Sequence, residues 1–116
     1  MKLAIVGSRK VLISYDEFKS IIRISLDLSF IDTIVSGGAK GIDSFAEQFA
    51  TENHLKLIVH KPDYSRYGKS APLVRNTLII EDSDWVLALP SKDSKGTWDS
   101  IRKAQKLDKR LKIVQI

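Results

Sequence analysis

The stretch from Ile34 to Asp43, which reads IVSGGAKGID, constrains the fold of this chain more than any other. An apolar run breaks into glycines, and apolar residues then recur at the spacing of a helix that buries one face: Ile42, Phe45, Ala46, Phe49 and Ala50. This pattern predicts a strand, a tight turn and the start of a helix. Free amides and the helix dipole favour an anion at such a start, and small residues let it approach. A phosphate site is therefore predicted, although a glycine-rich corner also occurs in proteins without any ligand.

Short apolar runs alternate with helical patterns along the whole chain. The strands are expected at 3–6, 33–36, 55–59, 84–89 and 111–116, and the further helices at about 15–29, 71–80 and 98–107. Between Tyr15 and Ser29 the apolar positions fit both a helix and a strand, and we favour a helix because parallel strands need a crossover. We predict an α/β fold: a single Rossmann-like three-layer domain over residues 1–116, with helices on both faces of a five-stranded parallel sheet in the order 3-2-1-4-5.

Three loops rich in small residues follow the first, second and fourth predicted strands. Together they supply the candidate ligand-binding residues Gly7, Ser8, Arg9, Ser36, Gly37, Gly38, Ala39, Lys40, Ser94, Gly96 and Thr97. In the predicted order the switch point lies between the first and fourth strands, so the first and third loops should face each other there. Asp43, in the first turn of the helix, either satisfies free amides or accepts hydrogen bonds from a ribose or a base.

The segment 61–70 is polar and aromatic, and we predict a loop whose tyrosines stack on a base, with Tyr67 among the ligand residues. The helix after it opens with Pro72 in its first turn. Its apolar face is predicted from Leu73, Val74, Thr77, Leu78, Ile79 and Ile80. Arg75 and Asn76 lie off that face and are expected to project towards the loops.

Residue types exclude several kinds of chemistry. The chain has no cysteine, so disulfides, thiolate metal sites and a cysteine nucleophile are excluded. His54 and His60 have no partner at metal-ligand spacing, and we expect no metal and no cofactor. The serines lie in turns with no visible base, so no nucleophilic triad is predicted. No apolar run is long enough for a signal peptide or a membrane span, so we expect a cytoplasmic protein without a membrane partner.

The formal net charge of +5 favours polyanionic partners only weakly. The positive charges crowd the last quarter of the chain: Lys92, Lys95, Arg102, Lys103, Lys106, Lys109, Arg110 and Lys112. Two interpretations of this cluster remain open. It is a solvated helix face, as charge runs usually are, or it is part of a nucleic-acid surface.

Four motifs in this order resemble those of the YspA-like branch of the SLOG superfamily. They are Gly7-Ser8-Arg9, the run from Ser36 to Asp43, Tyr67-Gly68 with Arg75-Asn76, and the run from Ser94 to Thr97. The resemblance covers nearly the whole chain and implies a Rossmann-like fold that binds nucleotides or nucleotide-derived ligands with these loops. It also implies that Arg75 and Asn76 border the pocket.

Two branches of that superfamily imply different functions. LOG-type phosphoribohydrolases cleave the N-glycosidic bond of nucleoside monophosphates with a glycine-rich loop and a glutamate. Here Asp93 and Ser94 replace the first glycines and Ser100 stands at the glutamate position, which argues against hydrolysis because a serine cannot act as a carboxylate does. The DNA-processing protein of natural transformation has very similar Gly-Ser-Arg and Ser-Gly-x-Ala-x-Gly-Ile-Asp motifs and binds single-stranded DNA.

Three hypotheses follow from these residues. The first is a sensor or sequestering module that binds a nucleotide or a nucleotide-derived small molecule. The second is an enzyme acting on a nucleotide N-glycosidic or phosphate bond, with Arg75 and Asp99 as the candidate catalytic residues. The third is a single-stranded nucleic-acid binder. A homodimer, supported by apolar helix faces and by Trp85 or Trp98, also remains open.

Overall fold

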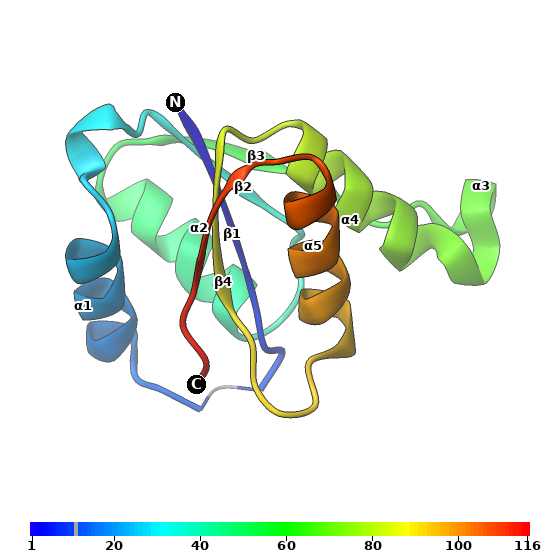
Figure 1. The fold of residues 1–116 in the computed structure, drawn as a ribbon, viewed down its shortest axis with the longest axis horizontal. Coiled ribbons are helices and arrows are strands. Elements are labelled where there is room, and N and C mark those ends of the chain that lie inside the picture. Colours follow the sequence, from blue (N-terminus) through cyan, green and yellow to red (C-terminus); the bar gives the residue numbers. More distant parts are fainter. Residues whose placement is uncertain (11) are drawn as a thin grey trace.

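Five parallel strands form one sheet in the order β3-β2-β1-β4-β5, as the sequence predicts. The computed structural model describes residues 1–10 and 12–116 (Figure 1). The strands are β1 (Lys2–Gly7), β2 (Thr33–Ser36), β3 (Lys56–Val59), β4 (Trp85–Leu89) and β5 (Arg110–Ile113). Because all five point the same way, the loops after β1, β2 and β4 leave the sheet at the same edge, which we call the rim.

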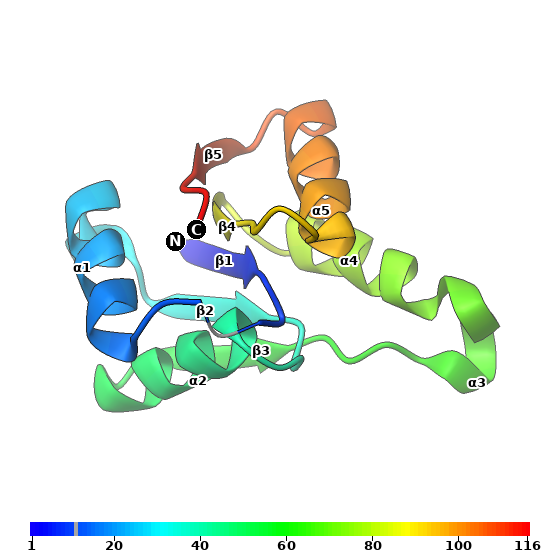
Figure 2. The ribbon, with the colours of Figure 1, turned by 90° about the horizontal axis from the view of Figure 1, so that it is seen from below.

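Helices cover both faces of the sheet. The longer ones are α1 (Tyr15–Ser25), α2 (Ile42–Glu52), α4 (Ala71–Glu81) and α5 (Lys95–Lys106). Figure 2 shows α1 and α2 on one side of the sheet and α4 and α5 on the other. Alternate residues of each strand face opposite sides, so Leu3 and Ile5 of β1 pack with Phe18 of α1, whereas Ala4 and Val6 pack with Ile101 of α5. The two cores fix both helix layers against one rigid sheet.

The first crossover is a helix, but it is shorter than predicted. Ser14 begins α1 with a capping box: its Oγ accepts a hydrogen bond from the Glu17 amide at 3.1 Å, and the Glu17 carboxylate accepts one from the Ser14 amide at 3.2 Å. The helix ends at Ser25 because Leu26 is extended, and a single 3-10 turn over Leu28–Phe30 replaces the predicted last turn.

The predicted loop between β3 and α4 contains two short helical turns, α3 (Tyr64–Tyr67) and η2 (Gly68–Ser70). The side chain of Asp63 caps α3 by accepting a hydrogen bond from the Arg66 amide at 3.2 Å. Figures 1 and 2 both show this part of the chain extending away from the sheet. We call residues 63–70 the arm.

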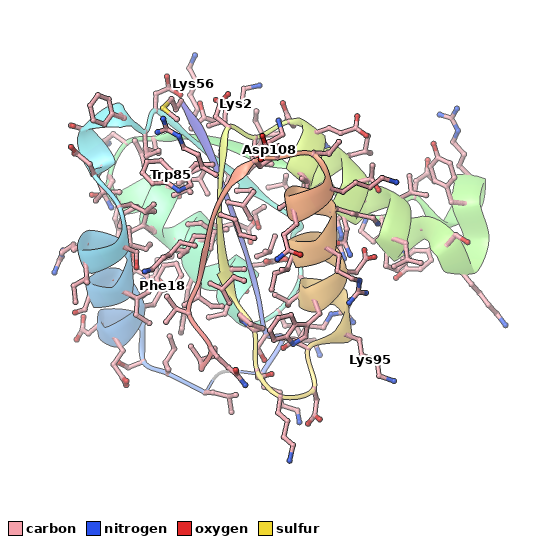
Figure 3. All side chains as sticks on the ribbon, in the orientation of Figure 1. Lys2, Phe18, Lys56, Trp85, Lys95 and Asp108 are labelled. Carbon is pink, nitrogen blue, oxygen red and sulfur yellow. The ribbon has the colours of Figure 1, made fainter. Side chains whose placement is uncertain are left out.

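Two predicted helices differ in the structure. In α4, Leu73 and Leu78 are 50% and 44% exposed, so the predicted apolar face is wrong at both residues, and the buried face includes Arg75 and Asn76 instead. Helix α5 begins at Lys95, three residues earlier than predicted, because Gly96 is part of its first turn. Figure 3 places Lys95 at the rim and Lys2 and Asp108 at the opposite end of the sheet.

Candidate functional site

The first and second rim loops are locked together through their backbones. The Ile42 amide at the start of α2 donates a hydrogen bond to the Ser8 carbonyl at 3.0 Å. Gly41, with φ of 73°, lies directly against the same segment: a Cβ there would lie 2.7 Å from the Arg9 carbonyl carbon. Only glycine satisfies both the positive φ and this close approach. These backbone contacts fix the position of the Arg9 backbone at the rim.

A cluster of serine hydroxyls joins the first and third loops across the switch point. The Ser91 Oγ donates to the Ser8 Oγ at 2.9 Å and lies 2.7 Å from the Ser94 Oγ. The Ser91 amide also donates to the Ser94 Oγ, at 2.8 Å. Ser8 and Ser91 are buried, so these bonds hold the two loops at a fixed separation.

This use of Ser94 leaves the first turn of α5 without a side-chain cap, in contrast to the capped start of α1. Among the described residues, no hydrogen-bond acceptor meets the amides of Gly96 or Thr97. A Cβ at Gly96 would meet nothing within 4 Å, so packing does not require glycine at this position. The start of α5 therefore presents free amides to open space at the rim.

Arg75 lies on α4 behind the second loop and is only 7% exposed. Its Nη1 donates to the Gly37 carbonyl at 2.7 Å and its Nε donates to the Asn76 Oδ1 at 3.0 Å. The Asn76 amide in turn donates to the Gly96 carbonyl at 3.3 Å, which ties α4 to the start of α5. Within the described part of the chain, no carboxylate forms an ion pair with Arg75 and no acceptor meets its Nη2. Burial lowers the pKa of Arg75 from its ordinary value, the nearby Asp43 carboxylate opposes this shift, and the guanidinium of Arg9 adds to it.

Asp43 satisfies a free amide in the turn before α2, which is one of the two roles predicted for it. Its Oδ2 accepts a hydrogen bond from the Ala39 amide at 3.1 Å, which closes the turn before α2. Burial raises the pKa of this carboxyl to about 6, against the effects of the Ala39 amide and of Arg75. Asp43 also lines a cavity together with Gly96 and Thr97, so its carboxyl faces any ligand bound there.

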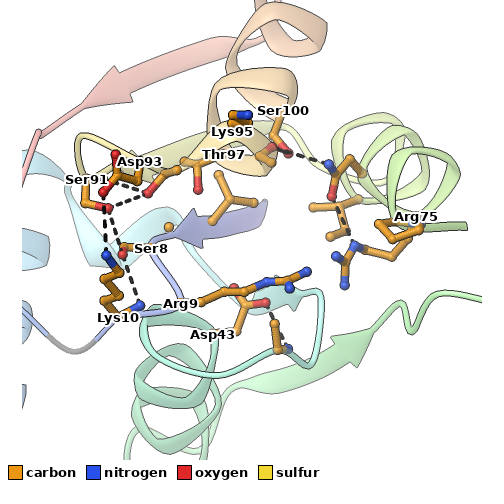
Figure 4. Close-up of a pocket in the computed structure, with 18 residues that line it drawn as sticks. Ser8, Arg9, Lys10, Asp43, Arg75, Ser91, Asp93, Lys95, Thr97 and Ser100 are labelled. Atoms are coloured by element: carbon orange, nitrogen blue, oxygen red, sulfur yellow. Dashed lines mark hydrogen bonds and ion pairs between the residues drawn. The ribbon is translucent and has the colours of Figure 1, made fainter. Parts of the chain in front are cut away.

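Two adjoining cavities open at the rim. The first, which we call the rim cavity, has a volume of about 480 Å³, and the second, the arm cavity, about 420 Å³. Three residues line both: Arg9, Ala39 and Arg75. Figure 4 shows the side chains of Arg9 and Arg75 reaching towards each other across the rim cavity, with Asp43 beside Arg9. Two arginines therefore stand where the two cavities meet.

A family model described as the YspA, cpYpsA-related SLOG family matches residues 22–67, which include the glycine-rich second loop. Over these residues the chain is similar to the SLOG family that its four motifs resemble. A search of curated proteins finds no significant match.

Two solved structures superpose on nearly the whole chain. One is the X-ray structure of DNA processing protein A (DprA) from Streptococcus pneumoniae, with 23% sequence identity and a TM-score of 0.75 over 97% of this chain and 49% of that one. The other is DNA processing protein A from Helicobacter pylori, described for its single-stranded DNA binding mode, with 26% identity and a TM-score of 0.74 over 97% of this chain and 64% of that one. This chain thus spans about half to two thirds of the length of the DprA chains.

The structure gathers most of the predicted SLOG motif residues around the two cavities. The rim cavity is lined by Gly7, Ser8, Arg9, Ala39, Asp43, Arg75, Asn76, Ser94, Gly96 and Thr97. The arm cavity is lined by Gly37, Gly38 and Lys40, together with the three shared residues. Ser36 and Tyr67 line neither cavity: Ser36 is fully buried at the end of β2, where its Oγ accepts a 3.4 Å hydrogen bond from the Gly38 amide, and Tyr67 lies on the arm.

Sequence reasoning on the SLOG motifs missed several lining residues. Those of the rim cavity are Val6, Lys10, Pro72, Ile79, Ser91, Asp93, Lys95 and Ser100, and those of the arm cavity are Pro62 and Tyr64. The sequence held a signal for three of them: Tyr64 lies in the segment 61–70 whose tyrosines were predicted to stack, Lys95 lies in the motif from Ser94 to Thr97, and Ser91 lies just after a predicted strand at the switch point. The others depend on which side chains the fold turns towards the rim.

Asp99, a candidate catalytic residue, lines neither cavity. Its Oδ2 accepts hydrogen bonds from the Lys103 Nζ at 2.7 Å and from the Asn76 Nδ2 at 3.1 Å. Among the described residues, no group of His, Asp or Glu side chains could hold a metal ion, and no helix is long and apolar enough to cross a membrane.

Proposed function

We propose that this protein binds a nucleotide or a nucleotide-derived ligand through its phosphate at the rim, as a sensor or sequestering module. The observation that carries the proposal is Arg75, a buried guanidinium with an Nη2 that meets no acceptor among the described residues and with no carboxylate partner there. An unpaired buried charge is costly, whereas a phosphate oxygen would give Arg75 a charge-assisted hydrogen bond. The other two nitrogens of Arg75 donate hydrogen bonds to Asn76 and Gly37, and these bonds fix the position of the guanidinium.

The start of α5 supports the same proposal independently. The free amides of Gly96 and Thr97 open onto the rim cavity, and they are the groups that hold phosphates at helix N-termini. The absence of any packing reason for glycine at residue 96 fits a ligand that approaches the backbone closely. Arg9 adds a flexible, exposed cation on the opposite wall.

Single-stranded nucleic acid is the second candidate ligand. It is favoured by the structural likeness to Helicobacter pylori DprA, which is described by its binding of single-stranded DNA. The rim also offers Lys10, Lys40 and Lys95 around the two cavities for further phosphates. Hydrolysis has weaker support, because Asp99 is engaged by Lys103 and Asn76 and Ser100 occupies the position where a carboxylate would be needed.

Binding can be tested by isothermal titration calorimetry and thermal shift with 5′-mononucleotides of all four bases and with inorganic pyrophosphate. We expect wild type to bind at least one mononucleotide, and Arg9→Gln to weaken binding roughly tenfold, since one charge-assisted hydrogen bond is lost. Arg23→Gln is the matched control, because it removes the same charge from an exposed site on α1. Equal losses in both variants, or no binding at millimolar ligand, would contradict the proposal.

A further inference from the structure

The rim and arm cavities are similar in size, and each is large enough for a ligand of its own. Their volumes are about 480 Å³ and about 420 Å³. Sites for small organic ligands usually occupy about 300–1,000 Å³. Since the cavities meet at Arg9, Ala39 and Arg75, a ligand bound at these residues has room on both sides.

The two cavities differ in what they offer. The rim cavity has an apolar floor made by Val6 and Ile79, with the serine hydroxyls and the amides of α5 above it. The arm cavity has Tyr64 and Pro62 on one wall and the glycines of the second loop on the other. Tyr64 is 59% exposed, so its ring is accessible for stacking on a flat base.

The two arginines lie where the cavities meet, whereas each lysine lines one cavity alone: Lys10 and Lys95 the rim cavity, and Lys40 the arm cavity. The guanidiniums of Arg9 and Arg75 reach towards each other in Figure 4, and the charge of Arg9 helps to lower the pKa of Arg75. A phosphate between them would relieve this repulsion. A mononucleotide would then extend its nucleoside into one cavity only and leave the other one to solvent.

Resting on the proposed function, we infer that the site takes two nucleoside units joined through phosphate, with one unit in each cavity and the linkage at Arg9 and Arg75. Two sources share this chemistry: a free dinucleotide and an internal step of a single strand. The proposal assigns Tyr64 to the second unit, as the residue that stacks on its base. Tyr67 has no such role because it lines neither cavity.

The experiment compares 5′-phosphorylated dinucleotides with mononucleotides of the same base, for thymidine and for deoxyadenosine, by calorimetry on wild type, Tyr64→Ala and Tyr67→Ala. For wild type, we expect the dinucleotide to bind at least about tenfold more tightly than the mononucleotide, the gain that stacking one base supplies. Tyr64→Ala should remove most of that gain and leave mononucleotide affinity within about twofold. Tyr67→Ala is the matched control on the same arm and should change neither affinity.

Each outcome decides the inference. Equal affinities for one and two units would overturn it while the proposed function stands, as would a Tyr64→Ala variant that weakens both ligands by the same factor. No binding of any nucleotide would remove both. A decathymidylate and diadenosine diphosphate then separate the sources: tighter binding of the decamer identifies a strand step, and tighter binding of the pyrophosphate-linked compound identifies a free dinucleotide.

Discussion

The two ends of the sheet carry positive charges that behave differently. Outside the two cavities, two lysines of the basic last quarter donate hydrogen bonds within the fold: the Lys103 Nζ donates to the Leu73 carbonyl at 2.8 Å and the Lys109 Nζ donates to the Ser83 carbonyl at 2.7 Å. The Arg110 guanidinium lies 5.6 Å from the centre of the Trp85 ring. At the rim, Arg75 is buried with no carboxylate partner among the described residues.

The contrast between these engaged side chains and Arg75 shows that the number of charged residues in a segment does not locate an anion site. Three side chains between Lys103 and Arg110 contact other parts of the fold: two lysines donate to backbone carbonyls, and Arg110 lies over the Trp85 ring. If the protein binds nucleic acid, we therefore expect the phosphates to contact the rim and not this cluster. Four variants test whether anion binding belongs to the rim alone.

Arg75→Gln should have the largest effect, a loss of nucleotide affinity of roughly 100-fold, because it removes a buried charge and its free donor from the cavity wall. The glutamine retains part of the hydrogen bonding to Gly37 and Asn76. Calorimetry with the best nucleotide measures the loss, and circular dichroism checks the fold. An affinity within a factor of three of wild type in a folded variant would remove the distinction between the two ends.

Asp43 faces the rim arginines, and its raised pKa makes stability depend on pH. Between its ordinary value of 3.8 and about 6, the folded state holds more protons than the unfolded state, so the free energy of unfolding falls as pH rises through this window. Asp43→Asn should remove this contribution to the fall and stabilise the protein by about 3 kcal/mol at pH 7. Urea unfolding at several pH values from 4 to 7.5 measures it, with the exposed Asp93→Asn as control. An unchanged pH profile in Asp43→Asn would contradict the assignment.

Lys109→Gln tests the opposite end. Loss of its hydrogen bond to the Ser83 carbonyl should lower the free energy of unfolding by about 1 kcal/mol while nucleotide affinity stays within twofold. Thermal denaturation and calorimetry on the same preparation give both values. A large loss of affinity with intact stability would return the anion site to the basic last quarter.

Gly96→Ala should have the smallest effect on stability, a gain of a few tenths of a kcal/mol, because alanine favours a helix and its Cβ would meet nothing within 4 Å. Nucleotide binding should nevertheless weaken, since the methyl group would occupy space on the cavity wall. Denaturation and titration together separate the two effects. Unchanged affinity would mean that no ligand approaches this backbone.

The strand order was predictable from the sequence, and so was the meeting of the three loops at one edge. Short apolar runs, turn residues and the rule for parallel crossovers suffice for both. The burial of Arg75 was not predictable, because a helical pattern assigns an arginine beside apolar residues to the surface, and here the hydrogen bond to the Gly37 carbonyl compensates part of the cost. The choice of Tyr64 over Tyr67 depends on the direction of the arm, which is a tertiary property. The homodimer stays a prediction: Trp85 and Trp98 are partly buried against the two cores.

The contact between Gly41 and the segment after β1 has a kinetic consequence. Because the Ile42 amide and the Ser8 carbonyl already hold the first two loops together, no large movement is needed before a ligand can load. Association should then proceed at the speed of oriented diffusion, and differences between ligands should appear mainly in how long each one stays. A side chain introduced at residue 41 would slow loading without touching the ligand itself.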